Sequence, residues 1–208
     1  MFYKVVRFIG YILTLLFWPI KTKGKKNLIK ESSLILAVNH VSYLDPIVLG
    51  VAVRRQIHFI AKKEIFNIPI LGFIIRSLGA IPVDRKKANP VSIKKSFLVL
   101  KKGNILGIFP EGARSMNGEL LEFNIGLIKI ALKTKSPIIP VGINGTFSIY
   151  PPKAKFPNFF KRKNIYINFG EPIYLDNTRA KDIKYQKESL LLIKEKIREL
   201  TTSIVNKQ

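Results

Sequence analysis

The sequence predicts an α/β fold in which a mostly parallel or mixed central sheet is flanked by helices. Short apolar runs that are typical of buried strands alternate with longer segments that have a helical pattern. The clearest run is Leu34–Val38, which ends at Asn39. Near the C-terminus, apolar residues recur at helical spacing from Leu190 to Ile204, with charged residues between them.

The individual elements follow from these periodicities and from the positions of proline and glycine. Pro46 and Pro90 each open a helix, because the fixed φ of proline suits the first helical turn. Gly103 closes the second of these helices as a C-cap. Pro140 predicts an edge strand or an irregular strand end, because it cannot donate to a ladder. Strands are predicted at residues 34–38, 57–61, 80–83, 104–109, 138–143 and 165–169, and helices at 46–53, 68–78, 90–100 and 184–205.

Composition limits the class of protein. A chain of 208 residues with 47% hydrophobic residues is long enough for one domain with a substantial core and is unlike a disordered protein. The absence of cysteine excludes disulfides and a cysteine-ligated metal, and no metal site or resident cofactor is predicted. The net charge of +23 indicates a polyanionic partner, either nucleic acid or an anionic membrane surface.

The N-terminal segment predicts a membrane contact. Residues 8–20 carry no charge, but this run is shorter than the ~20 residues that a spanning helix needs. Trp18 and nearby aromatic residues suit the headgroup boundary, and lysines follow from Lys21. No small-residue cleavage pattern of a signal peptide follows Pro19. We expect residues 1–26 to form an interfacial or re-entrant anchor and residues 27–208 a catalytic domain; a core helix is the alternative for the N-terminal run.

A second candidate surface is the segment 151–163, in which three phenylalanines and five basic residues share a proline-rich loop. Aromatic residues among basic ones are typical of nucleic-acid surfaces as well as of lipid-binding ones. The apolar N-terminal run beside its own lysines favours lipid, and an ordinary surface loop is the remaining alternative.

Polar residues follow the predicted strands directly. His40 and, five residues later, Asp45 come after the first strand. Such a pair can form an oriented general base, although Asp45 as an N-cap before Pro46 would explain it without any chemistry. His58, within a strand and without an acidic neighbour, is interpreted as structural. Because sites in open α/β sheets form at the carboxyl ends of strands, these positions are candidates for chemistry.

Three further strand ends carry functional groups. Arg85 follows the strand at 80–83, and a loop with Glu111, Gly112, Arg114 and Ser115 follows the strand at 104–109. The planar guanidinium of arginine suits phosphate, and glycine lets backbone approach a ligand closely. The segment 144–146, Asn-Gly-Thr, follows the strand at 138–143.

Four blocks in one order resemble the glycerolipid acyltransferase family. They are Asn39-His40 with Asp45, the segment 79–85 that ends in Arg85, Phe-Pro-Glu-Gly-Ala-Arg-Ser at 109–115, and Ile-Pro-Val-Gly-Ile at 139–143. Ala113 replaces a threonine that is usual in this family, and Asn124 replaces a lysine, for which Lys129 could substitute. These departures affect the acceptor assignment more than the reaction class.

The resemblance implies acyl transfer from an acyl-carrier-protein or coenzyme A thioester to the hydroxyl of a lysophospholipid, 1-acyl-glycerol-3-phosphate, giving phosphatidic acid. It implies catalytic roles for His40 and Asp45. It further implies that Arg85, Glu111, Gly112, Arg114 and Ser115 bind substrate. The expected place is the cytoplasmic face of the cell membrane, as a monotopic or peripheral protein on an anionic surface. Open alternatives are glycerol-3-phosphate or another hydroxyl lipid as acceptor, a nucleic-acid-binding protein, and an inactive membrane scaffold.

Overall fold

The computed structural model describes residues 2–28, 33–84, 90–161 and 163–202. Within these residues seven strands form one mixed sheet in the order β1-β7-β6-β2-β5-β3-β4, in which only β6 and β7 pair antiparallel. The strands are β1 (Ile20–Lys23), β2 (Leu34–Val38), β3 (Ile57–Lys62), β4 (Ile81–Val83), β5 (Ile105–Ile108), β6 (Ile138–Asn144) and β7 (Ile165–Phe169). The predicted fold class is therefore confirmed.

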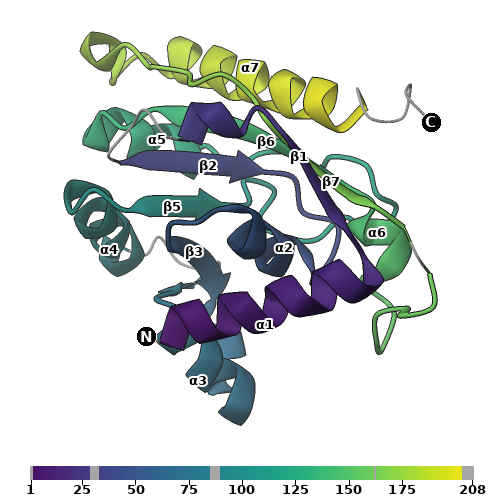
Figure 1. Ribbon diagram of the computed structural model, residues 1–208. Coiled ribbons are helices and arrows are strands. Elements are labelled where there is room, and N and C mark those ends of the chain that lie inside the picture. Colours follow the sequence, from purple (N-terminus) through teal and green to yellow (C-terminus); the bar gives the residue numbers. More distant parts are fainter. Residues whose placement is uncertain (1, 29–32, 85–89, 162, 203–208) are drawn as a thin grey trace.

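Helices cover both faces of the sheet (Figure 1). The α-helices are α1 (Phe2–Phe17), α2 (Asp45–Ala52), α3 (Pro69–Ser77), α4 (Pro90–Lys101), α5 (Gly126–Thr134), α6 (Thr146–Ile149) and α7 (Ile183–Thr202). The 3-10 turns are η1 (Lys25–Leu28), η2 (Lys63–Asn67) and η3 (Asn177–Arg179). Helices α2 and α6 pack into one core, and α4, α5 and α7 into the other.

Strand β2 lies at the centre of both cores. Leu34, Leu36 and Val38 point to the α2 side, whereas Ile35 and Ala37 point to the α5 and α7 side. This alternation is the period of two that a strand imposes on its side chains. Because both faces are covered, every residue of β2 is buried, which explains why its sequence is a continuous apolar run rather than an alternating one.

Helix α1 is packed by its small and polar residues and exposes its apolar ones. Gly10 and Thr14 are its buried residues, and a Cβ on Gly10 would lie 3.0 Å from Val51 Cγ2 of α2. The exposed apolar residues, which we call the α1 apolar face, are Phe2, Val5, Phe8, Ile9, Tyr11, Ile12, Leu13, Leu15 and Leu16. The apolar side chains of α1 therefore point away from the domain, an arrangement that favours the interfacial anchor over an ordinary core helix. Among the described residues, no helix combines the length and apolarity needed to cross a bilayer.

Two details of the sheet differ from expectation. Strand β6, which contains Pro140, is an interior strand, so the edge-strand option is wrong. The pairing with the chain around β7 shifts by one residue between Ile138↔Ile173 and Val141↔Phe169, and Pro140 lies in this irregular part. Proline has no backbone N–H, and Pro140 lies where the β6–β7 ladder is interrupted. The prediction of an irregular strand end is therefore confirmed. Strand β1 and helix α5 are elements that the sequence pattern did not predict.

The topology brings three functional strand ends together. Strands β6, β2 and β5 are adjacent, and β2 pairs parallel with both neighbours. Their carboxyl ends therefore meet at one edge of the sheet, where the segments after Val38, Ile108 and Asn144 converge.

Candidate active site

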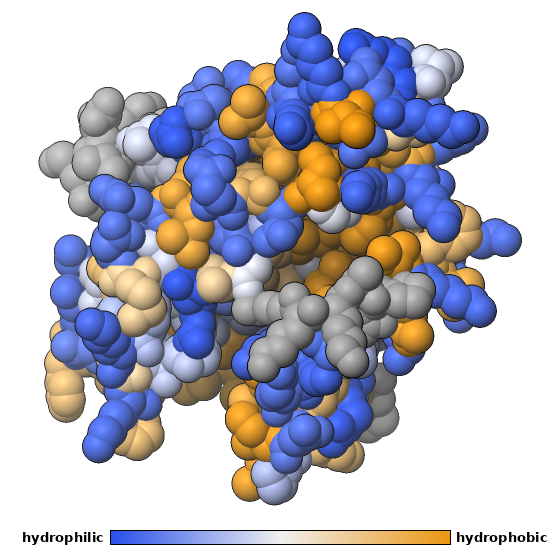
Figure 2. All heavy atoms as spheres, turned by 180° about the vertical axis from the view of Figure 1, so that it is seen from behind, coloured by the Kyte–Doolittle hydropathy of each residue, from blue (hydrophilic) through white to orange (hydrophobic). Residues whose placement is uncertain are grey.

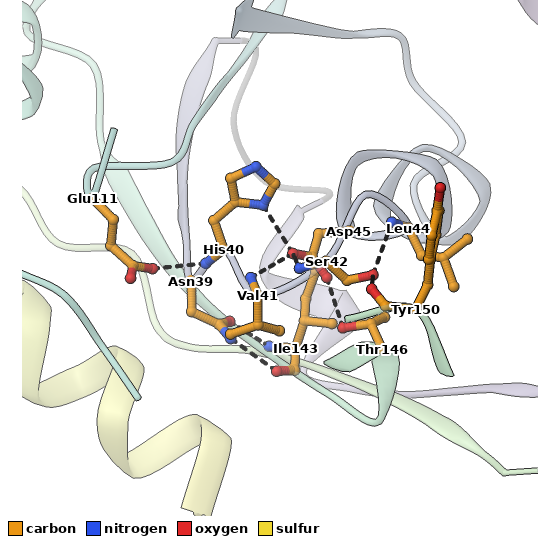
Figure 3. A network of polar contacts seen from close by, with 10 residues as sticks. All are labelled: Asn39, His40, Val41, Ser42, Leu44, Asp45, Glu111, Ile143, Thr146 and Tyr150. Atoms are coloured by element: carbon orange, nitrogen blue, oxygen red, sulfur yellow. Dashed lines mark hydrogen bonds and ion pairs between the residues drawn. The ribbon is translucent and has the colours of Figure 1, made fainter. Parts of the chain in front are cut away.

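His40 and Asp45 form a hydrogen-bonded pair at this edge. His40 Nδ1 lies 2.9 Å from Asp45 Oδ2; the Asp45 side chain is fully buried and that of His40 is 16% exposed. Asp45 Oδ2 also accepts from two backbone N–H groups, so it is an acceptor and Nδ1 carries the proton. The other ring nitrogen, Nε2, is then an acceptor, and it points away from the network (Figure 3).

Asp45 is held by the loop that precedes it as well as by the first residue of α6. Oδ2 accepts from the N–H groups of Val41 and Ser42, both at 2.8 Å, and Oδ1 accepts from Thr146 Oγ1 at 2.7 Å. The interpretation of Asp45 as an N-cap is wrong. Helix α2 begins at Asp45 itself, Leu44 is the N-cap, and the carboxylate turns back towards His40 instead of binding N–H groups of its own helix.

The loop after β5 holds the backbone of His40 on both sides. Glu111 Oε1 accepts from His40 N–H at 2.7 Å, and Ser115 N–H donates to His40 C=O at 2.9 Å. The ring of His40 stacks on Phe109, with the ring centroids 4.0 Å apart. The imidazole and the 109–115 loop are thereby fixed relative to each other.

Glu111 is a buried carboxyl with two backbone partners. Its second oxygen accepts from Leu121 N–H at 2.9 Å. The pKa of Glu111 is raised to about 7, mainly by burial and to a smaller extent by the charge of Asp45, although the two N–H donors oppose this shift. The hydrogen bonds show Glu111 supporting the backbone of His40 and Leu121, which the sequence did not indicate.

Gly112 and Ser115 shape the loop. Gly112 has φ of +68°, a conformation that glycine adopts without strain, and its N–H donates to Phe109 C=O at 3.0 Å. This N–H is therefore used within the turn. Ser115 Oγ donates to Asn117 Oδ1 at 2.9 Å and accepts from Gly118 N–H at 3.0 Å, so its hydroxyl orders the following turn.

Arg114 carries an unsatisfied donor. Its Cζ atom lies 3.4 Å from the ring centroid of Tyr43, so the guanidinium stacks on the tyrosine. Its Nη1 is a buried atom without a hydrogen-bond partner in the described part of the chain. A stacked, oriented guanidinium with a free N–H is suited to an anionic ligand. Arg85, the second predicted guanidinium, lies outside the described residues.

Three contributors to this network were not among the predicted site residues. Thr146 binds Asp45, Tyr43 supports Arg114, and Asn39 joins two strand ends. The Asn39 side chain accepts from Ile143 N–H at 2.7 Å and donates to Ile143 C=O at 2.9 Å, which continues the β2–β6 ladder beyond the strand (Figure 3). The polar segment 144–146 after a strand was the one signal that pointed to Thr146.

His58 has a structural contact, in agreement with its interpretation. Its Nδ1 lies 2.9 Å from Gly79 C=O, at the junction between α3 and β4. Among the described residues, no group of three or more potential metal ligands is present. Asn124, at the position where the family pattern has lysine, donates its backbone N–H to Pro110 C=O at 2.8 Å and so supports the base of the 109–115 loop.

Comparisons with known proteins agree with this geometry. A family model described as acyltransferase matches residues 19–144. The 1-acyl-sn-glycerol-3-phosphate acyltransferase of Bacillus subtilis is 35% identical over 156 residues, which cover 74% of each chain. The protein of the same name from Borreliella burgdorferi is 31% identical over 176 residues, covering 82% of this chain and 66% of that protein.

A solved structure has the same fold. The crystal structure of the 1-acyl-sn-glycerophosphate (LPA) acyltransferase PlsC from Thermotoga maritima matches with a TM-score of 0.77 and 27% sequence identity, covering 95% of this chain and 77% of that one. The family model spans both the His40–Asp45 pair and the Arg114 loop. From the sequence blocks, the site that they build and these matches, we conclude that the chain belongs to the acyltransferase family.

Proposed function

We propose that the protein transfers a fatty acyl group from an acyl thioester to the free hydroxyl of 1-acyl-glycerol-3-phosphate, giving phosphatidic acid. The observation that carries this proposal is the pair formed by His40 and Asp45 beside a loop that presents the unsatisfied guanidinium of Arg114. A base and a phosphate-binding group are the two parts that this acceptor needs. The names of the relatives support the same substrate.

In the proposed reaction, His40 Nε2 takes the proton of the acceptor hydroxyl as its oxygen attacks the thioester carbonyl. Asp45 holds the imidazole by Nδ1 and stabilises the imidazolium. The tetrahedral intermediate then expels the thiolate, which takes the proton from His40 and leaves as the thiol. General base catalysis of this kind contributes about 100- to 10,000-fold to a rate.

The loop residues position the acceptor in this proposal. Arg114, with Arg85, binds the phosphate and so brings the hydroxyl to His40 Nε2. Gly112 permits the turn that carries Arg114, and Glu111 and Ser115 hold His40 and this loop together. The acyl donor is an acyl-carrier-protein or coenzyme A thioester, which acts as a substrate, and the reaction uses no further cofactor.

The protein acts at the cytoplasmic face of the cell membrane, bound to an anionic surface by residues 1–26, with residues 27–208 as the acyltransferase domain. The α1 apolar face supports this, since Phe8 and Leu16 are 63% and 62% exposed. Apolar residues continue from it in both directions. Phe2 contacts Phe73 of α3, and Phe17 contacts Phe159, which neighbours the 98% exposed Phe160.

On the side of the molecule opposite to α1, hydrophilic side chains project around most of the outline. Hydrophobic side chains lie in a central hollow and also in patches on the surface around it (Figure 2). An extended apolar strip along a helix is typical of an interfacial helix that lies in the plane of the bilayer surface.

The test of the reaction is a thioester-release assay with identification of the lipid product by mass. His40→Ala should lower turnover by at least about 100-fold, whereas His58→Gln, which changes the other histidine of the chain, should keep it. Retained turnover in the His40 variant would exclude this histidine as the base. Acyl transfer to glycerol-3-phosphate in preference to 1-acyl-glycerol-3-phosphate would change the assigned acceptor and leave the chemistry in place.

The phosphate role of Arg114 has a separate test. Arg114→Ala should raise KM for the acceptor by about tenfold or more, because it removes charge-assisted hydrogen bonds, and should change KM for the acyl donor little. An equal rise of both KM values would contradict phosphate binding at this guanidinium.

A further inference from the structure

A cationic pocket, separate from the candidate active site, lies between α1 and the segment after α2. It has a volume of about 570 Å³ and is lined by one side of α1, from Tyr3 to Tyr11, and by Arg54 and Gln56. Its size falls in the ordinary range of small-molecule sites. None of these residues belongs to the candidate active site. Helix α2, whose first residue is Asp45 and which ends two residues before Arg54, separates the two sites by its length of ~12 Å.

The pocket has an excess of positive charge without acidic neighbours in the sequence. Lys4, Arg7 and Arg54 line it, and no Asp or Glu occurs at positions 1–30 or 46–63. Arg7 Nε is a buried atom without a hydrogen-bond partner in the part of the chain that the structure describes. An unpaired guanidinium N–H in a cationic pocket is the feature that an anionic ligand would satisfy.

Lys25 of η1 belongs to the same cluster. Burial lowers the pKa of the Lys25 ammonium, and the charges of Arg54 and Arg7 lower it further. The three cations are thus close enough to repel one another. Like charges that are brought together on a folded protein destabilise it unless an anion compensates them, so the cluster favours a bound anion.

The surroundings of the pocket indicate what kind of anion it takes. Phe8 lines the pocket and is also part of the α1 apolar face, so the cationic site opens beside the surface that is proposed to contact lipid. A ligand that fits both would carry a phosphate for the arginines and an apolar chain for the face of α1. Arginine is suited to the phosphate because its planar fork donates two parallel hydrogen bonds.

We propose that this pocket binds the phosphate headgroup of an anionic bilayer phospholipid that is not the reacting acceptor. The proposal rests on the membrane docking proposed above and adds a specific headgroup site to it. The bound lipid fixes α1 at the bilayer surface and thereby sets the orientation of the active site, at the other end of α2, to the membrane.

The direct test uses a short-chain lipid, so that it does not depend on membrane docking. Dihexanoyl phosphatidylglycerol, kept as a monomer, is titrated calorimetrically into the full chain carrying Arg114→Ala, which removes the active-site guanidinium. We expect saturable binding at one site. The pair Arg7→Gln and Arg54→Gln should weaken it by about tenfold or more, because two charge-assisted contacts are lost.

The matched control removes the same charge from the opposite side. Arg179→Gln with Arg198→Gln eliminates two guanidinium groups that are exposed on η3 and α7, and should leave the affinity unchanged. Equal weakening by both pairs, or no saturable binding at all, would overturn the headgroup site. If inorganic phosphate bound as tightly as the short-chain lipid, the pocket would be a free-phosphate site and the assignment to a lipid would be wrong.

Two further measurements keep the outcome clear. If the double variant unfolds at a lower temperature, Arg7→Lys is used instead; it keeps the charge, loses the fork and should still weaken lipid binding severalfold. In flotation with phosphatidylcholine vesicles, with or without phosphatidylglycerol, the Arg7 and Arg54 variant should lose only the preference for phosphatidylglycerol. Absence of any vesicle binding by the unmodified chain would refute docking, while the titration still decides the headgroup site.

Discussion

Asp45 combines two tasks at the level of a single residue: it is the first residue of α2, and it orders the loop that carries His40. Its two carboxylate oxygens accept from His40, Val41, Ser42 and Thr146. Such a saturated carboxylate has few alternative positions, so the imidazole that it holds is pre-oriented. Precise orientation of this kind is worth more to catalysis than proximity alone.

Thr146 is expected to act on catalysis through Asp45. Thr146→Val removes a hydrogen bond to a buried charge and keeps the shape of the side chain, so kcat should fall by about tenfold while KM for either substrate changes little. Thr146→Ser should restore most of the activity, since it retains the hydroxyl. Full activity in the valine variant would show that Asp45 needs no support from α6.

Glu111 is expected to make stability depend on pH. Because the folded state raises the pKa of Glu111 from 4.5 to about 7, its protonated form is favoured on folding. The resulting stabilisation is complete below pH ~4.5 and is lost as the pH rises through ~7, which amounts to about 2 to 3 kcal/mol between pH ~5 and ~8. Denaturant unfolding of the original chain and Glu111→Gln across this range should differ by this slope; parallel curves would contradict the raised pKa.

The sequence indicated the candidate groups of the site, but not the contacts that hold them in place. His40, Asp45 and Arg114 belong to blocks that can be read directly, whereas their contacts with Thr146 and Tyr43 depend on which strand ends become neighbours. Residue 146 is 101 positions away from Asp45, so no local pattern links the two. The same limit explains why the interpretation of Asp45 as an N-cap was wrong. The sequence Asp45-Pro46 is typical of a helix start, but the carboxylate makes contacts with His40 and with the distant Thr146 instead.

Among the elements, buried strands were the most predictable. The predicted bounds of β2 and β7 match the structure residue for residue. In β2, which is covered on both faces, the run is continuously apolar, and in β7 only Asn168 interrupts it. Strand β1 was missed because Ile20–Lys23 is an edge strand with two lysines, which reads as a charged tail. The sheet order and the antiparallel pairing of β6 with β7 could not be predicted from the sequence, because they depend on contacts between residues that are far apart in the chain.

Helix α1 provides the test of membrane docking at the level of an element. Deleting residues 1–20 would also remove the buried Trp18 and the first residue of β1, so substitutions are cleaner. Phe8→Ser with Leu16→Ser should reduce flotation with anionic vesicles by more than about tenfold, because each apolar side chain contributes about 1.5–3 kcal/mol on leaving water. Thermal stability should change little, since both side chains are exposed.

The control pair for this measurement lies on α7. Leu191→Ser with Leu192→Ser also removes two exposed apolar side chains, from a helix on the other face of the sheet. Its flotation should equal that of the original chain. Similar losses for both pairs would mean that docking depends on general hydrophobicity and not on α1.

For the whole molecule, the net charge of +23 predicts how strongly salt affects docking. Raising the salt concentration from about 0.1 M to about 1 M shortens the Debye length from ~10 Å to ~3 Å. Binding to phosphatidylglycerol vesicles should therefore weaken markedly, whereas the insertion of apolar residues should persist. Complete insensitivity to salt in a vesicle sedimentation assay would show that the basic surface plays no part.

The pairing of β1 with β7 links residues from the two ends of the chain, since Ile20 lies opposite Ile165. During synthesis, the segment Phe2–Phe17 leaves the ribosome long before the strand that completes the sheet has been made. The apolar side chains of α1 can therefore meet a bilayer while the domain is still incomplete. Contacts between such distant residues also form slowly. In the proposed membrane docking, folding would thus begin at the bilayer surface, before the active site has been completed.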